Sequence, residues 1–347
     1  MSEVSQVKQR SAYLDVIKGV AIILVVLAHC IQFGSGEQFY IDQQCFSDPL
    51  FSFIYGFHMP LFMIVSGFLF WNSVNKHSNG KVAVSRLKSL QVPIVVWQTV
   101  YLILLYLSGQ ITLSSSLVYS YRGALWFLWS VLICSMIVLV GRVCFKDSIL
   151  FCLLVCVLLL FVPDQYLSSL HVFMFPYFVA GYYWNRYGMR NRYNSLSHEA
   201  KWMLCGGSFV GFLLFYFLYD APERSIYLNG TCLLGRASVG AQLLIDMARY
   251  CYGLLGVSMV MILIDQLLPY LKESVIGKSL VELGKISLGI YVINHYTYDL
   301  MLLLPISSNY VYMLTILETV ITMMFIYWTI KLIERSRYIS LLLLGKG

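Results

Sequence analysis

Long apolar stretches separated by short polar connections repeat from one end of the 347-residue sequence to the other. A helix needs roughly 17 to 25 apolar residues to cross the hydrocarbon core of a bilayer, and the pattern predicts ten such segments. They are expected at 14–33, 50–71, 92–107, 125–140, 149–163, 168–184, 202–219, 251–271, 286–304 and 310–330. We therefore expect an all-α integral membrane protein, a bundle of about ten transmembrane helices. A single transmembrane domain would cover 1–347, with a polar cytosolic leader at 1–13.

Composition and charge agree with a membrane protein and give it an orientation. Hydrophobic residues make up 59% of the chain and charged residues 12%, with a mean hydropathy of +0.74. If the N-terminus is cytosolic, only Arg122, Arg224, Arg236 and Arg249 of the 24 basic residues fall in outer segments. This bias predicts cytosolic termini and relates the net charge of +7 to anionic membrane lipids rather than nucleic acid. The first segment is too long for a signal peptide and lacks a small-residue cleavage site, so it is expected to remain as a helix.

The sequence lacks the motifs of several common enzyme classes. Gly277–Ser279 resembles the end of a P-loop, but Lys272 stands where that motif needs glycine. HExxH, GxSxG and dinucleotide-binding patterns are absent. The nine cysteines form no CxxC and no metal-ligand spacing with histidine. We expect no bound metal, although Cys45, Cys232 and Cys251 could pair in an oxidising compartment.

The first apolar segment carries a polar stripe. Lys18 and His29 are eleven residues apart, so at 3.6 residues per turn they share one helix face about 16 Å apart. Asp15 lies on the same side, three residues before Lys18. Ionisable groups inside a membrane usually line a bundle interior or a water-filled cavity, and histidine exchanges protons near neutral pH. The alternatives are an interfacial anchor for the lysine and a hydrogen-bonded interhelical histidine.

Five motifs along the chain carry a family resemblance. They are YLDVIKGVAIILVVLAH (13–29), FHMPLFMIVSGFLF (57–70), RLKSLQVP (86–93), ALWFL (124–128) and SLGIYVINH (287–295). Their order and spacing resemble the acyltransferase-3 family of bacterial membrane proteins, most closely its fucose 4-O-acetylase-like branch of sugar O-acetyltransferases. The resemblance covers essentially the whole chain.

The resemblance implies an O-acetyltransferase of the bacterial cytoplasmic membrane. Such a protein moves an acyl group, commonly acetyl from cytosolic acetyl-CoA, to a hydroxyl of a cell-surface or lipid-linked glycan, with no permanently bound cofactor. The family's Arg/Lys-x10-His element falls on Lys18 and His29, which makes His29, Lys18 and Asp15 the expected catalytic set. The family's RxxR element is half matched: Arg86 fits, Ser89 replaces the second arginine, and Lys88 stands beside it. Arg86 and Lys88 are the expected acyl-CoA contacts.

Further polar positions could border the reaction chamber. The second segment carries His58 and Ser66 around a proline and a glycine, which bend a membrane helix and allow close helix approach. In the ninth segment His295 and Asp299 are four residues apart, so the carboxylate could orient the imidazole. Trp126 is a third candidate. The two histidines could equally be structural, and Ser66 could serve packing alone.

The outer segments are rich in aromatic residues. Their rings could pack on the apolar faces of sugars, or they could form the interfacial belt that membrane proteins commonly carry. These residues are Tyr40, Tyr119, Tyr121, Trp126, Tyr166, Tyr219 and Tyr227. The polar connection expected at 220–250 is a candidate lid or glycan contact.

The mechanism suggested by these features begins with acyl-CoA binding at the basic connection of 72–91. His29 then acts as general base on a sugar hydroxyl, or carries the acyl group itself. The polar stripe would form the route of the pantetheine arm. A transporter or flippase of lipid-linked glycans is the alternative from another class, and a non-catalytic scaffold is a third.

Overall fold

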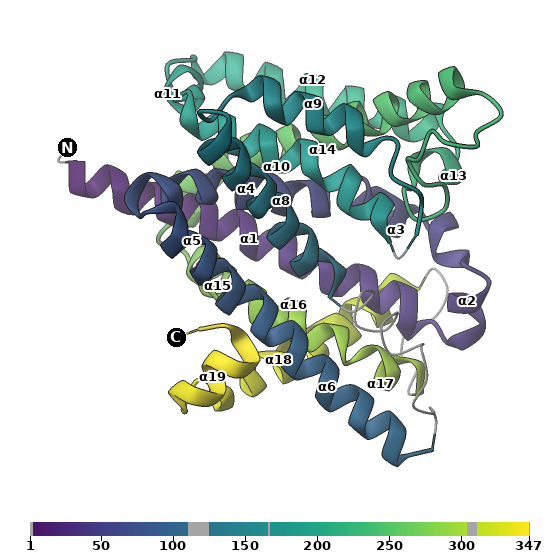
Figure 1. Cartoon of the computed structure of the whole chain (residues 1–347). Coiled ribbons are helices and arrows are strands. Elements are labelled where there is room, and N and C mark those ends of the chain that lie inside the picture. The colour runs from purple at the N-terminus through teal and green to yellow at the C-terminus, as the bar shows by residue number, and fades with distance from the viewer. Residues whose placement is uncertain (1–2, 110–124, 166, 304–310, 347) are drawn as a thin grey trace. The chain divides into compact units, whose positions relative to one another are not determined.

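A computed structural model describes residues 3–109, 125–165, 167–303 and 311–346, with side chains from residue 12 onward. Within these ranges every regular element is a helix (Figure 1). Seven helical spans are long and apolar enough to cross a membrane. They are Ala12–Gly34, Pro49–Lys76, Asn79–Leu107, Trp126–Cys144, His198–Leu218, Val239–Leu271 and Tyr312–Ile333. The chain is therefore an all-α, multi-pass membrane protein.

The helices are labelled in chain order. Those of the first half are α1 (Glu3–Gly34), α2 (Glu37–Ile41), η1 (Gln44–Ser47), α3 (Pro49–Tyr55), α4 (His58–Lys76), α5 (Asn79–Arg86), η2 (Leu87–Gln91), α6 (Val92–Leu107), α8 (Trp126–Cys144) and α9 (Ile149–Leu159). Those of the second half are α10 (Ser168–Arg186), α11 (Met189–Asn194), α12 (His198–Leu218), α13 (Ala221–Arg224), α14 (Val239–Leu271), α15 (Val275–Lys285), α16 (Ser287–His295), α17 (Tyr298–Leu303), α18 (Tyr312–Ile333) and α19 (Arg337–Leu344).

The chain forms two compact units, each built from segments distant in sequence. The first unit contains 1–62, 191–228 and 244–330. Its centre is α1, which packs along α15, α16 and α17 and also contacts α2 and α3 (Figure 1). Two glycines permit the close packing of α1 on α15, because a Cβ at Gly19 would clash with the carbonyl of Leu280 and one at Gly284 with the carbonyl of Asp15. The absence of side chains at these two positions thus sets the position of α1.

The second unit contains 63–190, 229–243 and 331–347. Here α10 packs on α8 and α9, and α19 packs on α6. A Cβ at Gly67 of α4 would clash with the carbonyl of Phe178, so α4 and α10 approach closely. Asp147 lies between α8 and α9, where it pairs with Arg142 at 3.3 Å and with Arg186 at 3.2 Å. Tyr182 also donates to its carboxylate, and these bonds offset the cost of burying the charge.

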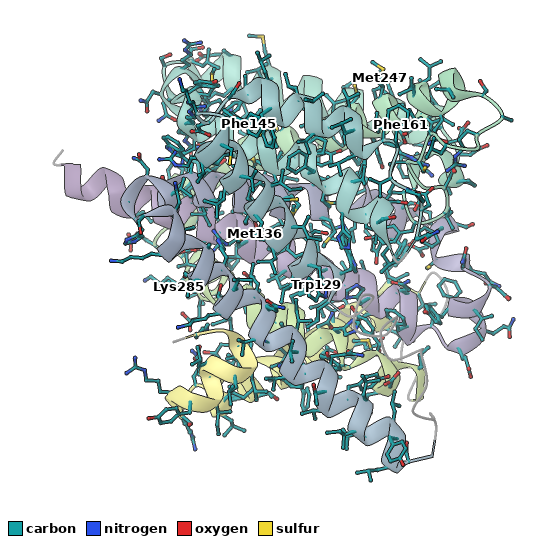
Figure 2. All side chains as sticks on the ribbon, in the orientation of Figure 1. Trp129, Met136, Phe145, Phe161, Met247 and Lys285 are labelled. Carbon is teal, nitrogen blue, oxygen red and sulfur yellow. The ribbon has the colours of Figure 1, made fainter. Side chains whose placement is uncertain are left out.

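Large apolar side chains remain exposed on the helices. Phe145, Phe161 and Met247, which are labelled in Figure 2, have exposed fractions of 49%, 47% and 63%. A water-soluble protein rarely leaves many such groups uncovered. In a bilayer they contact lipid tails.

Three predicted boundaries are wrong. The basic connection at 72–91 is mostly helical, since α4 extends to Lys76 and α5 and η2 continue into α6. The connection expected at 220–250 ends at 238, because α14 begins at Val239. The ninth segment is interrupted: it consists of α16 and α17, preceded by the amphipathic α15. The ends of the ninth and tenth segments at 304–310 fall outside the described residues.

Candidate active site

His29 lies inside the membrane-spanning part of α1 and contacts the broken helix α16–α17. Nδ2 of Asn294 is 2.6 Å from its Nδ1 atom. The hydroxyl of Tyr298 is 3.1 Å from Nδ1 and 3.2 Å from Nε2. The Tyr298 ring stacks on Phe33, one turn beyond His29, with ring centres 4.1 Å apart. The imidazole is thus held by an amide, a phenol and an aromatic stack.

The break between α16 and α17 brings Asn294 and Tyr298 to the same histidine. α16 ends at His295 and α17 begins at Tyr298. The backbone N–H and the hydroxyl of Thr297 both donate to the carbonyl of Asn294, at 3.1 and 2.8 Å, so this carbonyl is satisfied at the break. Interrupted helices occur at membrane depth where they are buried in protein or line a polar cavity. Local structure here therefore provides polar contacts inside an apolar span.

Two further histidines belong to the same unit. His58, at the start of α4, is buried and donates from Nδ1 to the carbonyl of Ile54 at 2.9 Å, which leaves Nε2 as the acceptor nitrogen. His295 lies with its ring centre 5.1 Å from that of Tyr298. His29 and His295 thus both lie against the ring of Tyr298, with ring centres 4.8 and 5.1 Å from it, and His58 belongs to the same unit.

The two other members of the predicted catalytic set form an ion pair. Nζ of Lys18 is 2.7 Å from a carboxylate oxygen of Asp15, and both side chains are largely buried. At 1.5 Å per residue along α1, Lys18 lies about 16 Å from His29. Direct contact between them is therefore excluded within the helix. Lys18 supplies positive charge on the same helix face.

The predicted donor-binding residues belong to the second unit. Arg86 ends α5 and is half-buried, with its guanidinium 5.1 Å from the ring centre of Phe70. Lys88 is exposed on η2, a π-helical turn. π-helical turns often occur at functional sites.

The remaining predicted residues are less closely associated with His29. Asp299 is exposed at the start of α17 and acts on His295 through its charge. Ser66, on α4, and Trp126, the first residue of α8, are half-buried in the second unit. The groups that contact His29 through α16 and α17 are Asn294 and Tyr298 rather than the predicted pair His295 and Asp299.

Aromatic residues of the first unit, some of them expected in outer segments, lie beside His58. Tyr55 donates to the Gln32 side chain at 3.1 Å, and its ring centre lies 4.7 Å from that of His58 and 5.4 Å from that of Tyr227. Tyr40 and Tyr227 are 40% and 36% exposed. Tyr119, Tyr121 and Tyr166 lie outside the described residues.

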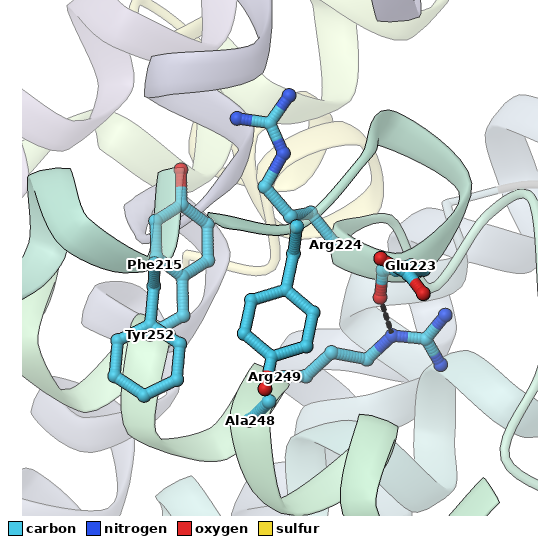
Figure 3. Close-up of a pocket in the computed structure, with 7 residues that line it drawn as sticks. Phe215, Glu223, Arg224, Ala248, Arg249 and Tyr252 are labelled. Carbon is cyan, nitrogen blue, oxygen red and sulfur yellow. Dashed lines mark hydrogen bonds between the residues drawn. The ribbon is translucent and has the colours of Figure 1, made fainter. Parts of the chain in front are cut away.

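The segment that carries Tyr227 is fixed by a buried arginine. Arg249 of α14 donates to the carbonyls of Glu223, Pro222 and Ser225 at 2.6, 3.1 and 3.2 Å. It also pairs with Asp246 at 3.1 Å, and the two side chains are 1% and 3% exposed. Figure 3 shows Arg249 beside Glu223 in a small pocket that Phe215 and Tyr252 also line. Arg249 and Asp246 therefore belong to a helix and not to the polar connection expected from the sequence.

Glu318 is one of the buried acidic residues that sequence reasoning missed. Glu318 of α18 is 3% exposed, and its carboxylate occupies the space where a Cβ of Gly34 would lie. A lone glutamate within an apolar segment is a signal that could have marked it. Within the described ranges no three His, Cys, Asp or Glu side chains lie at metal-binding distances, and all nine cysteines are free thiols.

Comparison with known proteins identifies the family. The family model described as an acyltransferase domain, acyltransferase-3, matches residues 11–335. The nodulation protein NolL of Sinorhizobium fredii is 33% identical over 135 residues, covering 35% of this chain and 34% of that protein. NolL of Mesorhizobium japonicum is 27% identical over 141 residues, covering 36% and 34%. The match thus spans about a third of each relative, and no solved structure matches the chain. Because the family model spans nearly the whole sequence and the membrane helices that carry His29 and its partners, the chain belongs to the acyltransferase-3 family.

Proposed function

We propose that this protein is an O-acetyltransferase of the bacterial cytoplasmic membrane. It would move an acetyl group from cytosolic acetyl-CoA to a hydroxyl of a cell-surface or lipid-linked glycan. Membership of the acyltransferase-3 family supports acyl transfer. The observation that carries the proposal is His29, an ionisable side chain held inside a membrane-spanning helix by Asn294 and Tyr298.

His29 acts as the general base. It takes the proton of the acceptor hydroxyl while the sugar oxygen attacks the thioester carbonyl. The C–O bond forms, the C–S bond breaks, and the imidazolium returns its proton to the leaving thiolate, giving free CoA and the O-acetyl ester. A positioned base contributes about 10²- to 10⁴-fold to such a reaction. The surrounding helices limit access of water, which would otherwise hydrolyse the thioester.

Arg86 and Lys88 bind the phosphates of the donor. Coenzyme A is a multiply charged anion, and arginine forms charge-assisted, bidentate bonds with phosphate. The Arg86 guanidinium lies 5.1 Å from the ring centre of Phe70, and its N–H groups would bind the donor phosphates. Lys88, on the adjoining π-helical turn, adds a second positive charge.

The acceptor sugar binds among the aromatic residues of the first unit. Sugar rings present apolar C–H faces that pack on aromatic rings. Tyr40 and Tyr227 are exposed enough to meet such a ring, and Tyr55 lies between Tyr227 and His58. With cytosolic termini and ten membrane crossings, this aromatic group would face the outer side.

Donor dependence separates the acetyltransferase from a glycan transporter. Membranes that contain the protein are supplied with acetyl-CoA labelled in the acetyl group, and the label in envelope glycan is measured. An acetyltransferase incorporates label only with a thioester donor. Glycan movement across the membrane without incorporation would support the transporter and contradict the proposal.

Arg86 is tested by comparing Arg86→Ala with Lys285→Ala. Lys285 is exposed at the end of α15 and labelled in Figure 2, so its loss removes one positive charge without removing the guanidinium on Phe70. We expect Arg86→Ala to raise KM for acetyl-CoA about tenfold or more, as loss of a charge-assisted bond predicts. Lys285→Ala should leave KM unchanged. Equal KM values in both variants would remove Arg86 from the donor site.

A further inference from the structure

Asn294 lies between His29 and Thr297 and is completely buried. One terminal atom of its side-chain amide is 2.6 Å from Nδ1 of His29. The other terminal atom is 3.4 Å from the hydroxyl oxygen of Thr297. The hydroxyl of Thr297 also contacts the backbone carbonyl of Asn294 at the shorter distance of 2.8 Å.

An amide can place either its oxygen or its NH₂ group toward the histidine, and the two orientations have opposite consequences. An NH₂ group would donate to the Nδ1 lone pair, so neutral His29 would carry its proton on Nε2. An amide oxygen would accept a proton from Nδ1, so Nε2 would keep its lone pair. Only with the amide oxygen toward Nδ1 does Nε2, the nitrogen that Asn294 does not contact, keep a lone pair that can accept a proton.

Thr297 decides between the two orientations. A hydroxyl has one hydrogen, and the short contact with the carbonyl of Asn294 uses it. Toward the side chain of Asn294 the hydroxyl therefore presents only lone pairs. An amide oxygen in that place would set two acceptors against each other in a buried site, whereas an NH₂ group donates to the hydroxyl. The structure places Nδ2 of Asn294 toward His29 and Oδ1 toward Thr297, and this hydrogen-bond pattern favours the flipped amide, with its oxygen toward His29.

We propose that Asn294 is a positioning residue that accepts the Nδ1 proton of His29 and so fixes Nε2 as the catalytic base. This inference rests on the proposed acetyl transfer for its kinetic test, because the base has a role only if a hydroxyl is deprotonated. In the resting site the Tyr298 hydroxyl, 3.2 Å from Nε2, donates to the lone pair that later receives the acceptor proton.

The kinetic test compares Asn294→Asp with Asn294→Leu. Aspartate has the same shape as asparagine, and its carboxylate can only accept hydrogen bonds. Leucine is of similar size and can neither donate nor accept them. We expect Asn294→Asp to keep kcat within about tenfold at its own pH optimum. We expect Asn294→Leu to lose about 100-fold in kcat with little change in KM for acetyl-CoA, which is the low end of the contribution of a positioned base.

The pH profile provides a readout that a purely structural role would not change. A carboxylate beside Nδ1 stabilises the imidazolium, so Asn294→Asp should move the acidic limb of the kcat profile to higher pH. The other titratable groups that act on His29 are His58 on α4 and His295 on α16, and Tyr298 of α17 contacts it. These groups are unchanged in both variants, so the difference between the profiles reports on residue 294.

The outcomes separate the inference from the proposed function. If Asn294→Asp were as inactive as Asn294→Leu at equal protein level and thermal stability, Asn294 would be a donor and the tautomer assignment would be wrong. If Asn294→Leu kept full activity, Asn294 would have no positioning role. ¹⁵N solid-state NMR of histidine-labelled wild type tests the tautomer without any acyl transfer: a proton on Nδ1 of His29 supports the inference, and a proton on Nε2 alone overturns it.

Discussion

Replacing Arg249 by methionine should release the segment that carries Tyr227. Arg249 donates to three carbonyls of residues 222–225 and pairs with the buried carboxylate of Asp246. Methionine keeps the apolar stem but removes every donor. Breaking a buried pair by removing one partner costs about 3 to 5 kcal/mol. Since about 1.4 kcal/mol is a factor of ten, local opening should become about 140- to 4000-fold more frequent.

Hydrogen exchange measured by mass spectrometry tests this estimate directly. Amides of residues 223–228 should lose protection by that factor, up to the limit set by global unfolding. Arg224→Met is the matched control, because Arg224 is half-buried and donates to a single carbonyl, that of Tyr216, at 2.7 Å. Unchanged exchange in Arg249→Met, or an equal loss in Arg224→Met, would refute the view that Arg249 holds this segment in place.

Two further predictions concern the second unit. Gly67→Leu should lower stability in detergent by about 1 to 3 kcal/mol or more, because the new side chain meets the carbonyl of Phe178. The control Gly206→Leu should leave stability unchanged, because a Cβ at Gly206 meets open space. Equal thermal unfolding of the two variants would contradict the prediction. Burial alone would raise the pKa of Glu334, but its bond to Lys346 at 2.6 Å and the nearby lysine charges hold that pKa below its ordinary value. Its contribution to stability is therefore present above the ordinary carboxyl pKa of about 4.3 and lost as pH falls through the lowered folded pKa. The difference in thermal unfolding temperature between wild type and Glu334→Gln should therefore disappear as pH falls through the lowered pKa of Glu334. A difference that grew as pH fell would contradict this prediction.

Much of the fold could be predicted from the sequence because a bilayer demands long apolar runs. Each predicted segment contains a helix in its described part, whereas the boundaries at 72–91 and 239–250 and the continuity of the ninth segment were wrong. Hydropathy marks the apolar part of a helix but not its polar extension. The helix α14 begins at Val239 although Asp246 and Arg249 follow, because these two charges neutralise each other in a buried pair.

The candidate site was predicted in part. Periodicity placed Asp15, Lys18 and His29 on one face, and the structure pairs the first two. Residues that contact His29 from another helix could not be chosen from spacing alone. Asn294 and Tyr298 lie in the predicted ninth segment, but their contact with His29 depends on the break after His295, which apolar periodicity does not mark.

The central claim is that His29 is the base of an acetyl transfer, and a matched histidine pair tests it most directly. Acetyl transfer from labelled acetyl-CoA to envelope glycan is measured in membranes that contain wild type, His29→Ala or His77→Ala at equal protein levels. His77 is exposed, so its loss removes a histidine without touching the site. We predict label with wild type and His77→Ala and a loss of at least 100-fold with His29→Ala. Equal label in all three would contradict the assignment of His29 as the base.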